Sequence, residues 1–256
     1  MLKDKVVVVT GGAGRIGSEF IRAIVKNNGI GVIAEVDTKR ANELKDEILN
    51  THKNAKVEAL QVDISDKKSI NELINFLHEK YGKIDALVNN AYPKSKNYGR
   101  KFFEIGIDDF NEFLGLHLGG YFNISQSFIS YFLKQKFGNI INISSIQGIG
   151  APAFETYEGT NMHSPIEYTA VKHGLIGMSK YMAKMFKKEG IRVNAISPGG
   201  ILDAQPEPFL SQYKKRCGTK GMLDAADICG ALVYLLSDAS MFVNGQNIVV
   251  DDGFSL

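Results

Sequence analysis

The stretch that decides the fold is residues 6–17, VVVVTGGAGRIG, in which four valines lead into a glycine-rich turn. Consecutive β-branched residues without polar alternation are typical of a parallel strand covered by helices on both faces. Apolar residues then recur at Ile16, Phe20 and Ile24, a spacing that predicts a helix. A strand, a glycine turn and a helix in direct succession predict a site for a dinucleotide, whose pyrophosphate rests on the helix N-terminus.

Glycines in this turn allow a tight bend and let backbone N–H groups approach a pyrophosphate. A purely structural glycine-rich turn is the alternative, but the preceding strand and the following helix favour cofactor binding. The residues assigned to the cofactor site on this basis are Gly11, Gly14, Arg15, Ile16 and Gly17.

Acidic residues stand at the end of the second predicted strand, beginning eighteen residues beyond Gly17. Glu35, and then Asp37, stand where a carboxylate can accept hydrogen bonds from the adenosine ribose hydroxyls. The same charge would repel a 2′-phosphate, so the sequence favours NAD over NADP. Lys39 and Arg40 could instead accommodate that phosphate, but we interpret them as solvated residues of the next helix.

Short β-branched runs alternate with helical patterns along the whole chain. This alternation predicts an α/β fold of Rossmann type: a single doubly wound parallel sheet of about seven strands with helices on both faces. No repeat or linker divides the chain, so we expect one dinucleotide-binding and catalytic domain over residues 1–256. Two segments, Ile149–Ser164 and Gly200–Met222, are expected to be loops beyond the strand ends. The expected strands are Val6–Thr10, Ile30–Val36, Lys56–Val62, Ala86–Asn89, Asn139–Ser144, Arg192–Ile196 and Asn247–Asp251.

The composition is that of an ordinary globular protein with a sizeable core. Of 256 residues, 44% are hydrophobic, and 30 basic against 28 acidic residues give a net charge of +2. This balance gives no reason to expect nucleic acid or a membrane as partner. The apolar run at 6–9 is too short for a signal peptide, and Cys217 and Cys229 lack metal-ligand spacing. We therefore expect a cytoplasmic protein without a metal site.

Tyr168 and Lys172 stand four residues apart, which places both on one face of a helix. Ser164 is expected to cap this helix, with Pro165 in the first turn and Glu167 completing a capping box. A tyrosine normally titrates near 10. The Lys172 cation and an oxidised nicotinamide would both lower the pKa of Tyr168, which could then take up or return the proton of an alcohol.

Polar residues also follow two other predicted strands. Ser144 and Ser145 end the fifth strand, where a hydroxyl can donate to a substrate oxygen; an ordinary strand-ending pair is the alternative. Asp63, followed by Ile64, ends the third strand. It could contact the adenine edge, or it could cap the helix that begins near Asp66.

Together these motifs resemble the short-chain dehydrogenase/reductase family, in particular its compact single-domain members. The resemblance implies that Ser145 orients the substrate, that Tyr168 is the general acid/base, and that Lys172 holds the nicotinamide ribose and tunes Tyr168. It further implies a homotetramer or homodimer. The cofactor contacts that it implies, besides those above, are Asp63, Ile64, Asn89, Ala91, Tyr168, Lys172, Pro198, Gly199 and Ile201.

Four positions depart from the family pattern. Tyr92 stands where the frequent NNAG motif has its glycine, so the motif here reads Asn89-Asn90-Ala91-Tyr92. Arg15 stands where compact members usually have glycine, so the turn reads TGxxGxxG, a spacing common in sugar epimerases and dehydratases. His117 stands where a helix asparagine often joins the proton relay; its imidazole could replace that asparagine, or it could be packed in the helix while water rebuilds the relay. Asp203 replaces a threonine that often contacts the cofactor amide.

The segment between Ser145 and Tyr168 is longer than usual in the family. Its extra residues, 153–163, are largely polar, which favours a polyhydroxylated substrate over a steroid or an acyl chain; a surface or subunit-contact loop is the alternative. Two basic clusters near the strand ends could hold a phosphate, or they could be solvated loops. These clusters are Lys94, Lys96, Arg100 and Lys101, and Lys214, Lys215, Arg216 and Lys220.

Residues 89–103, 157–168 and 197–209 are similar to oxidoreductases associated with bacterial flagellin modification. The similarity implies a sugar, or a phosphorylated or nucleotide-linked sugar, as the small-molecule substrate. Two other functions stay open: a sugar epimerase or dehydratase that recycles bound NAD, and a non-catalytic NAD-binding sensor subunit. The motifs do not specify the carbon oxidised, the direction of the reaction or the partner enzymes.

Overall fold

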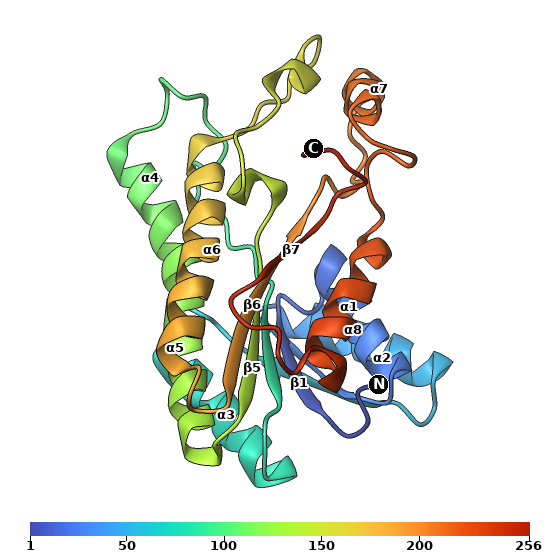
Figure 1. The fold of residues 1–256 in the computed structure, drawn as a ribbon, viewed down its shortest axis with the longest axis vertical. Helices are drawn as coiled ribbons and strands as arrows, with labels where there is room; N and C mark the ends of the chain where they lie inside the picture. Colours follow the sequence, from blue (N-terminus) through green and yellow to red (C-terminus); the bar gives the residue numbers. More distant parts are fainter.

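Seven parallel strands form one sheet in the computed structural model, which describes residues 1–256. The spatial order is β3-β2-β1-β4-β5-β6-β7, so the direction of winding changes between β1 and β4 (Figure 1). In such sheets a crevice forms beyond the carboxyl ends of the strands at the change of direction. The strands are β1 Val6–Thr10, β2 Ile30–Glu35, β3 Lys56–Gln61, β4 Ala86–Asn89, β5 Gly138–Ile143, β6 Ile191–Pro198 and β7 Asn247–Val250.

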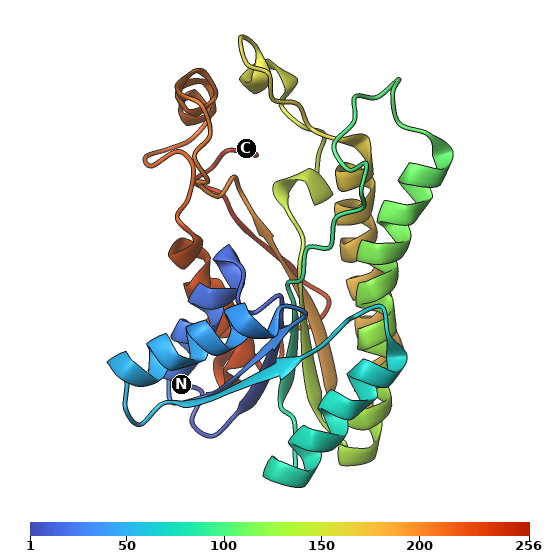
Figure 2. The same ribbon diagram turned by 180° about the vertical axis from the view of Figure 1, so that it is seen from behind.

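The predicted parallel α/β sheet is confirmed, and each strand lies within two residues of its expected bounds. Two helical layers enclose it: α1, α2 and α8 cover one face, and α3, α5 and α6 cover the other (Figures 1 and 2). The helices are α1 Arg15–Lys26, α2 Thr38–Thr51, α3 Lys67–Tyr81, α4 Ile107–Leu114, α5 Gly120–Gln135, α6 Ile166–Phe186, α7 Glu207–Lys215 and α8 Cys229–Leu236.

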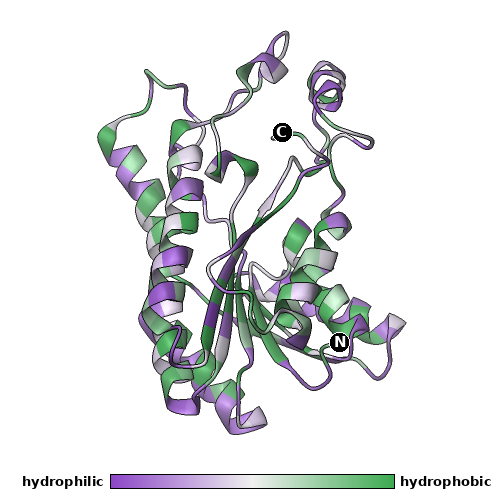
Figure 3. Cartoon of the chain, in the orientation of Figure 1, coloured by the Kyte–Doolittle hydropathy of each residue, from purple (hydrophilic) through white to green (hydrophobic).

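Alternation of side chains along the strands divides the core between these layers. Val7 and Val9 of β1 pack under α1 and α8, whereas Val6 and Val8 face the α3–α5–α6 layer. All four valines are fully buried, as the unbroken apolar run predicts. Figure 3 shows the same division: the central strands are mostly hydrophobic, and hydrophilic residues lie on the outer faces of the helices.

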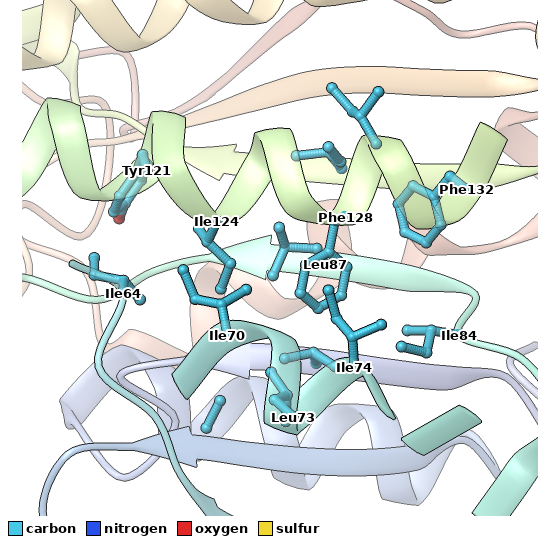
Figure 4. Close-up of a cluster of buried hydrophobic side chains, with 14 of the residues drawn as sticks. Ile64, Ile70, Leu73, Ile74, Ile84, Leu87, Tyr121, Ile124, Phe128 and Phe132 are labelled. Atoms are coloured by element: carbon cyan, nitrogen blue, oxygen red, sulfur yellow. The ribbon is translucent and has the colours of Figure 1, made fainter. Parts of the chain in front are cut away.

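The α5 helix carries the largest aromatic contribution to this core. Phe128 and Phe132 point from α5 toward α3, and they meet Ile74 and Leu87 between the helix and β4 (Figure 4). The two phenylalanine rings make an edge contact at 5.8 Å between centroids. This packing fixes α5, and with it the segment 107–119 that leads into it.

Two local predictions are wrong. Gly200–Met222 is not all loop, because Glu207–Lys215 forms α7. The expected capping box is absent from α6, whose N-cap is Pro165 without a side-chain bond. The Ser164 hydroxyl donates instead to Gln147 Oε1 at 2.7 Å, and Glu167 is buried and accepts from Gly99 N at 3.2 Å. Contacts with distant loops have displaced the local cap.

None of the helices combines the length and apolar character that a membrane span requires.

Truncation of Phe128 tests the packing of α5. We expect Phe128→Ala to lower the free energy of unfolding by about 3–5 kcal/mol, because it leaves a cavity in a fully buried site. Phe122→Ala, at a half-exposed position on the same helix, should change it by less than about 1 kcal/mol. Urea unfolding followed by circular dichroism measures both. Equal losses in the two variants would contradict the proposed core.

Candidate active site

A cleft of about 1050 Å³ opens beyond the carboxyl ends of the strands. It runs from the glycine turn after β1 to the segment before α6 and to α7, which stand above the sheet in Figure 1. Three residues assigned from the sequence do not line it: Gly17, Asn89 and His117. The assigned residues that do line it are Gly11, Gly14, Arg15, Ile16, Glu35, Asp63, Ile64, Ala91, Ser145, Tyr168, Lys172, Pro198, Gly199 and Ile201.

The glycine turn has the geometry that a pyrophosphate needs. Gly11 has a positive φ of 60°, and a Cβ there would lie 2.8 Å from Ala91 Cα. Gly14 precedes α1 and provides no side-chain cap, so the first N–H groups of the helix are free of side-chain partners. Gly17 lies beneath the turn, where a Cβ would lie 2.2 Å from Gly11 O. These residues fit a dinucleotide phosphate, with Gly17 allowing the close packing rather than lining the cleft.

Asn90, not Asn89, reaches the cleft from the end of β4. Asn89 is fully buried, and its amide donates to Ser125 Oγ at 2.9 Å and to Asn142 Oδ1 at 2.8 Å. Asn90 lines the cleft, and its amide donates to the carbonyls of Thr10 and Gly11 at 3.0 and 3.1 Å. Asn89 therefore braces the sheet, and Asn90 holds the glycine turn.

The carboxylates after β2 have different tasks. Glu35 lines the cleft and accepts from Val36 N at 3.0 Å, whereas Asp37 caps α2 by accepting from Lys39 N and Arg40 N at 3.0 and 3.1 Å. Arg40 is not simply solvated as expected. It turns back to the Ala13 carbonyl at 3.0 Å and lines the cleft beside Glu35. An acidic and a basic side chain thus both line the part of the cleft near the end of β2, where the adenosine of a dinucleotide is expected.

Asp63 lines the cleft and does not cap a helix. Its Oδ1 accepts from the backbone N and the hydroxyl of Ser65 at 2.8 and 2.6 Å. Asp66 caps α3 by accepting from Lys68 N at 2.8 Å. One oxygen of Asp63 is therefore left for a ligand at the edge of the cleft.

Ser145, Tyr168 and Lys172 meet where β5 ends against α6. Lys172 Nζ donates to the Ile143 carbonyl at 3.0 Å and lies 5.4 Å from the centre of the Tyr168 ring. Ser145 Oγ accepts from Gln147 N at 3.1 Å, which leaves its proton free to donate. The three side chains line one wall of the cleft, as a substrate oxygen would require.

Burial dominates the protonation of this group. It lowers the pKa of Lys172 to about 7 and raises that of Tyr168, while the neighbouring Ser145 hydroxyl acts against the rise in Tyr168. The expected lowering of the Tyr168 pKa by Lys172 is therefore absent from the protein alone. The physical reason is that both groups are removed from water, which disfavours the phenolate and the ammonium alike.

His117 lies in a π-helical turn, Gly115–Gly119, between α4 and α5. Its ring is fully buried, and neither nitrogen has a hydrogen-bond partner in the protein. Burial, followed by the charge of Lys172, holds its pKa well below the usual value, so the ring is neutral. The Tyr92 ring contacts His117 at 5.2 Å and Tyr168 at 5.8 Å between centroids, and Tyr92 itself lines the cleft.

Only one residue of the two basic clusters, Arg216, lines the cleft. It pairs with Glu155 and lies 5.0 Å from the centre of the Phe254 ring. Elsewhere Arg100 pairs with Asp109, and Lys220 pairs with two aspartates of the following turn. The structure therefore does not gather the eight cations around one phosphate.

The segment 153–163 forms part of the cleft wall, with a short 3₁₀ turn at Phe154–Tyr157. Tyr157 contacts Phe209 of α7 at 5.1 Å between ring centroids. On the other side, His163 Nε2 contacts the Gly99 carbonyl at 2.7 Å. The segment thus joins α7 to the loop after β4.

Sequence reasoning missed four residues of this region: Asn90, Tyr92, Gln147 and Glu167. The signals available in the sequence were the position of Asn90 directly after Asn89 and that of Gln147 two residues after Ser145. Arg15 pairs with Asp203 and donates to the Leu202 carbonyl at 2.9 Å, so Asp203 closes over the glycine turn.

Comparison with known proteins gives a consistent result. A family model described as enoyl-(acyl carrier protein) reductase matches residues 16–255. Over its whole length the chain is 46% identical to the whole of "post-translational flagellin modification protein A" of Campylobacter coli. The chain belongs to the short-chain dehydrogenase/reductase family. Enzymes of this family use NAD or NADP as the hydride carrier, which makes this chain an oxidoreductase.

Two other known proteins match this chain over nearly its whole length. The chain is 32% identical to a 7α-hydroxysteroid dehydrogenase of Bacteroides fragilis, over 99% of this chain and 95% of that protein. A short-chain dehydrogenase of Leptospira borgpetersenii with bound NAD⁺ superposes with a TM-score of 0.87 at 30% identity, covering 100% of this chain and 94% of that one. The fold is therefore that of this family.

Titration of Lys172 gives a pH-dependent stability. Below pH 7 the ammonium is charged and buried, which costs stability; between pH 7 and about 10.5 it is neutral when folded but still charged when unfolded. The stability of the wild type relative to Lys172→Met should therefore rise as the pH is raised from 7 to 10. Urea unfolding across this range, with the exposed Lys180→Met on the same helix as control, measures it. Parallel profiles for wild type and Lys172→Met would contradict the assignment.

Proposed function

We propose that this chain interconverts an alcohol and a carbonyl on a sugar, or on a phosphorylated or nucleotide-linked sugar, with NAD as cofactor. The observation that carries the proposal is the meeting of Ser145, Tyr168 and Lys172 in a cleft continuous with the glycine turn. NAD bound there would supply or accept the hydride. The residues of the chain handle the proton and the geometry.

Tyr168 is the proposed general acid/base, and Ser145 orients the substrate oxygen. Gln147 N–H already donates to Ser145 Oγ, so the Ser145 proton is available for an acceptor such as that oxygen. Lys172 Nζ is held by the Ile143 carbonyl near the Tyr168 ring. Its charge would favour the Tyr168 phenolate as the alcohol proton leaves.

His117 is proposed as a relay for this proton. A neutral imidazole can accept a proton at one nitrogen and donate at the other, and both nitrogens of His117 lack protein partners. No direct hydrogen bond joins His117 to Lys172, so the path requires a bridging water. Tyr92, which contacts both His117 and Tyr168, would confine that water.

NAD is favoured over NADP by Glu35, whose carboxylate lines the adenosine end and would repel a 2′-phosphate. Asp63, Ile64 and Ala91 would contact the same half of the cofactor, and Pro198, Gly199 and Ile201 would flank the nicotinamide. The family resemblance implies these roles, and the fact that all of these residues line the cleft supports them.

A role in flagellin glycosylation is proposed from the Campylobacter relative and from the polar segment 153–163, which supplies Glu155, Tyr157 and His163 to the cleft. Arg216 is the cation placed to contact a phosphate. We further propose a cytoplasmic homodimer or homotetramer, in keeping with the family resemblance.

Replacement of Tyr168 tests the catalytic assignment. Tyr168→Phe should bind NAD as the wild type does but lose turnover by several orders of magnitude, because only the hydroxyl is removed. NADH formation is measured against free, phosphorylated and nucleotide-linked sugars, and NAD affinity by calorimetry. Intact turnover in Tyr168→Phe would contradict the assignment, and turnover of a sugar without NADH release would indicate recycled cofactor.

Replacement of Glu35 tests the cofactor preference. Glu35→Ser should shift the NADP-to-NAD ratio of kcat/KM toward NADP by about tenfold, since it removes the repulsion and leaves Arg40 beside the ribose. Glu43→Ser, on the exposed face of α2, is the control and should leave the ratio unchanged. An unchanged ratio in Glu35→Ser would overturn the role of Glu35.

A further inference from the structure

Gln147 lies beside the catalytic serine, and the family resemblance assigned it no role. It forms the centre of a single 3₁₀ turn, Ile146–Gly148, directly after Ser145, and its side chain lines the cleft. Close contacts with Ser144 and Lys172 hold this turn in place. A Cβ at Gly148 would lie 2.4 Å from Ser144 Oγ and 2.6 Å from the Lys172 carbonyl, so the backbone of Gly148, next to Gln147, lies directly against α6.

Two hydroxyl groups fix the orientation of the Gln147 amide. Its Oε1 accepts from Ser164 Oγ at 2.7 Å and from Thr169 Oγ1 at 3.0 Å. Both acceptor positions of the carbonyl are then used. The Nε2 group has two N–H donors, and even with one of them directed at the nearby Tyr157 hydroxyl the other is left for a ligand.

The Tyr157 hydroxyl of the segment 153–163 lies on the same side. Burial raises the pKa of Tyr157, and the nearby Ser164 and Gln147 side chains act against that rise. Tyr157 and Gln147 both line the cleft, and the Gln147 amide lies close enough to the Tyr157 hydroxyl to interact with it. One N–H donor of the Gln147 amide is thus available in the cleft that also contains Ser145 and Tyr168.

We propose that Gln147 is a specificity-determining residue that binds a second oxygen of the substrate, close to the carbon that reacts. The ligand class is a vicinal diol or an α-hydroxy ketone, in which one oxygen meets Ser145 and Tyr168 and the other accepts from Gln147 Nε2. Thr169, which does not line the cleft, acts as a positioning residue for the amide. This inference rests on the proposed alcohol–carbonyl chemistry and narrows its substrates.

The physical basis is that a donor fixed in advance costs little entropy when it binds. A substrate without the second oxygen would leave this N–H donor without a partner in the closed site. One or two neutral hydrogen bonds correspond to a preference of roughly five- to tenfold.

The test compares trans-1,2-cyclohexanediol with cyclohexanol, two rings that differ by one hydroxyl. Calorimetry in the presence of NADH measures the affinity of the whole chain for each. The wild type should bind the diol about five- to tenfold more tightly. Gln147→Met should bring the ratio close to one with cyclohexanol affinity unchanged, and Thr169→Val should reduce the ratio in part. Thr51→Val, an exposed hydroxyl on α2, is the matched control and should keep the full ratio.

Equal affinity for the two alcohols, or no diol binding, overturns the proposal, as does a preference that survives in Gln147→Met. NADH formation from the same alcohols with NAD is recorded separately. A diol preference without NADH formation in the wild type supports Gln147 and counts against the dehydrogenase activity. NADH formation without a diol preference counts against the role of Gln147 and supports the dehydrogenase activity.

Discussion

The end of β4 is bound to the glycine turn after β1, and the rest of the site depends on this junction. Asn90 donates to the carbonyls of Thr10 and Gly11, while the Thr10 hydroxyl accepts from the backbone N–H groups of Asn90 and Ala91. Gly11 can approach Ala91 closely because it has no Cβ. The N-terminus of α1 therefore faces the same edge of the sheet as the carboxyl ends of β4 and β5. A dinucleotide lying along that edge would reach from Glu35 to Tyr168.

Much of the fold follows from local pattern alone. The valine run of β1 and the turn after it are specified by side chains that tolerate few other structures, so the strands appear within two residues of their predicted bounds. The cap of α6 could not be predicted in the same way. Ser164 and Glu167 have the right spacing, but Gln147 and Gly99, distant in sequence, offer them better partners. The helix α7 was hidden because its nine residues lie within a segment rich in glycine, proline and charge.

The sequence predicted the placement of site residues correctly where their spacing allows only one arrangement. The spacing of Tyr168 and Lys172 requires one helical face, and the structure puts both side chains in the cleft. Asn89 and Asn90 show the limit, because neighbouring residues at a strand end point to opposite sides and the sequence does not say which faces the ligand. Arg40 shows a second limit. The sequence pattern of an exposed first helical turn is the same whether Arg40 is solvated or contacts the Ala13 carbonyl. Gln147 gains its meaning only from Ser164 and Thr169, which a fold must bring to it.

The central claim is that one cleft holds the cofactor along the glycine turn and presents the reacting alcohol to Tyr168. A crystal structure of the chain with NAD tests this most directly. The account predicts the pyrophosphate against the first N–H groups of α1, the adenosine ribose within hydrogen-bonding distance of Glu35, and the nicotinamide beside Tyr168 and Lys172. A cofactor bound with its nicotinamide away from Tyr168, or with its ribose out of reach of Glu35, would contradict the account.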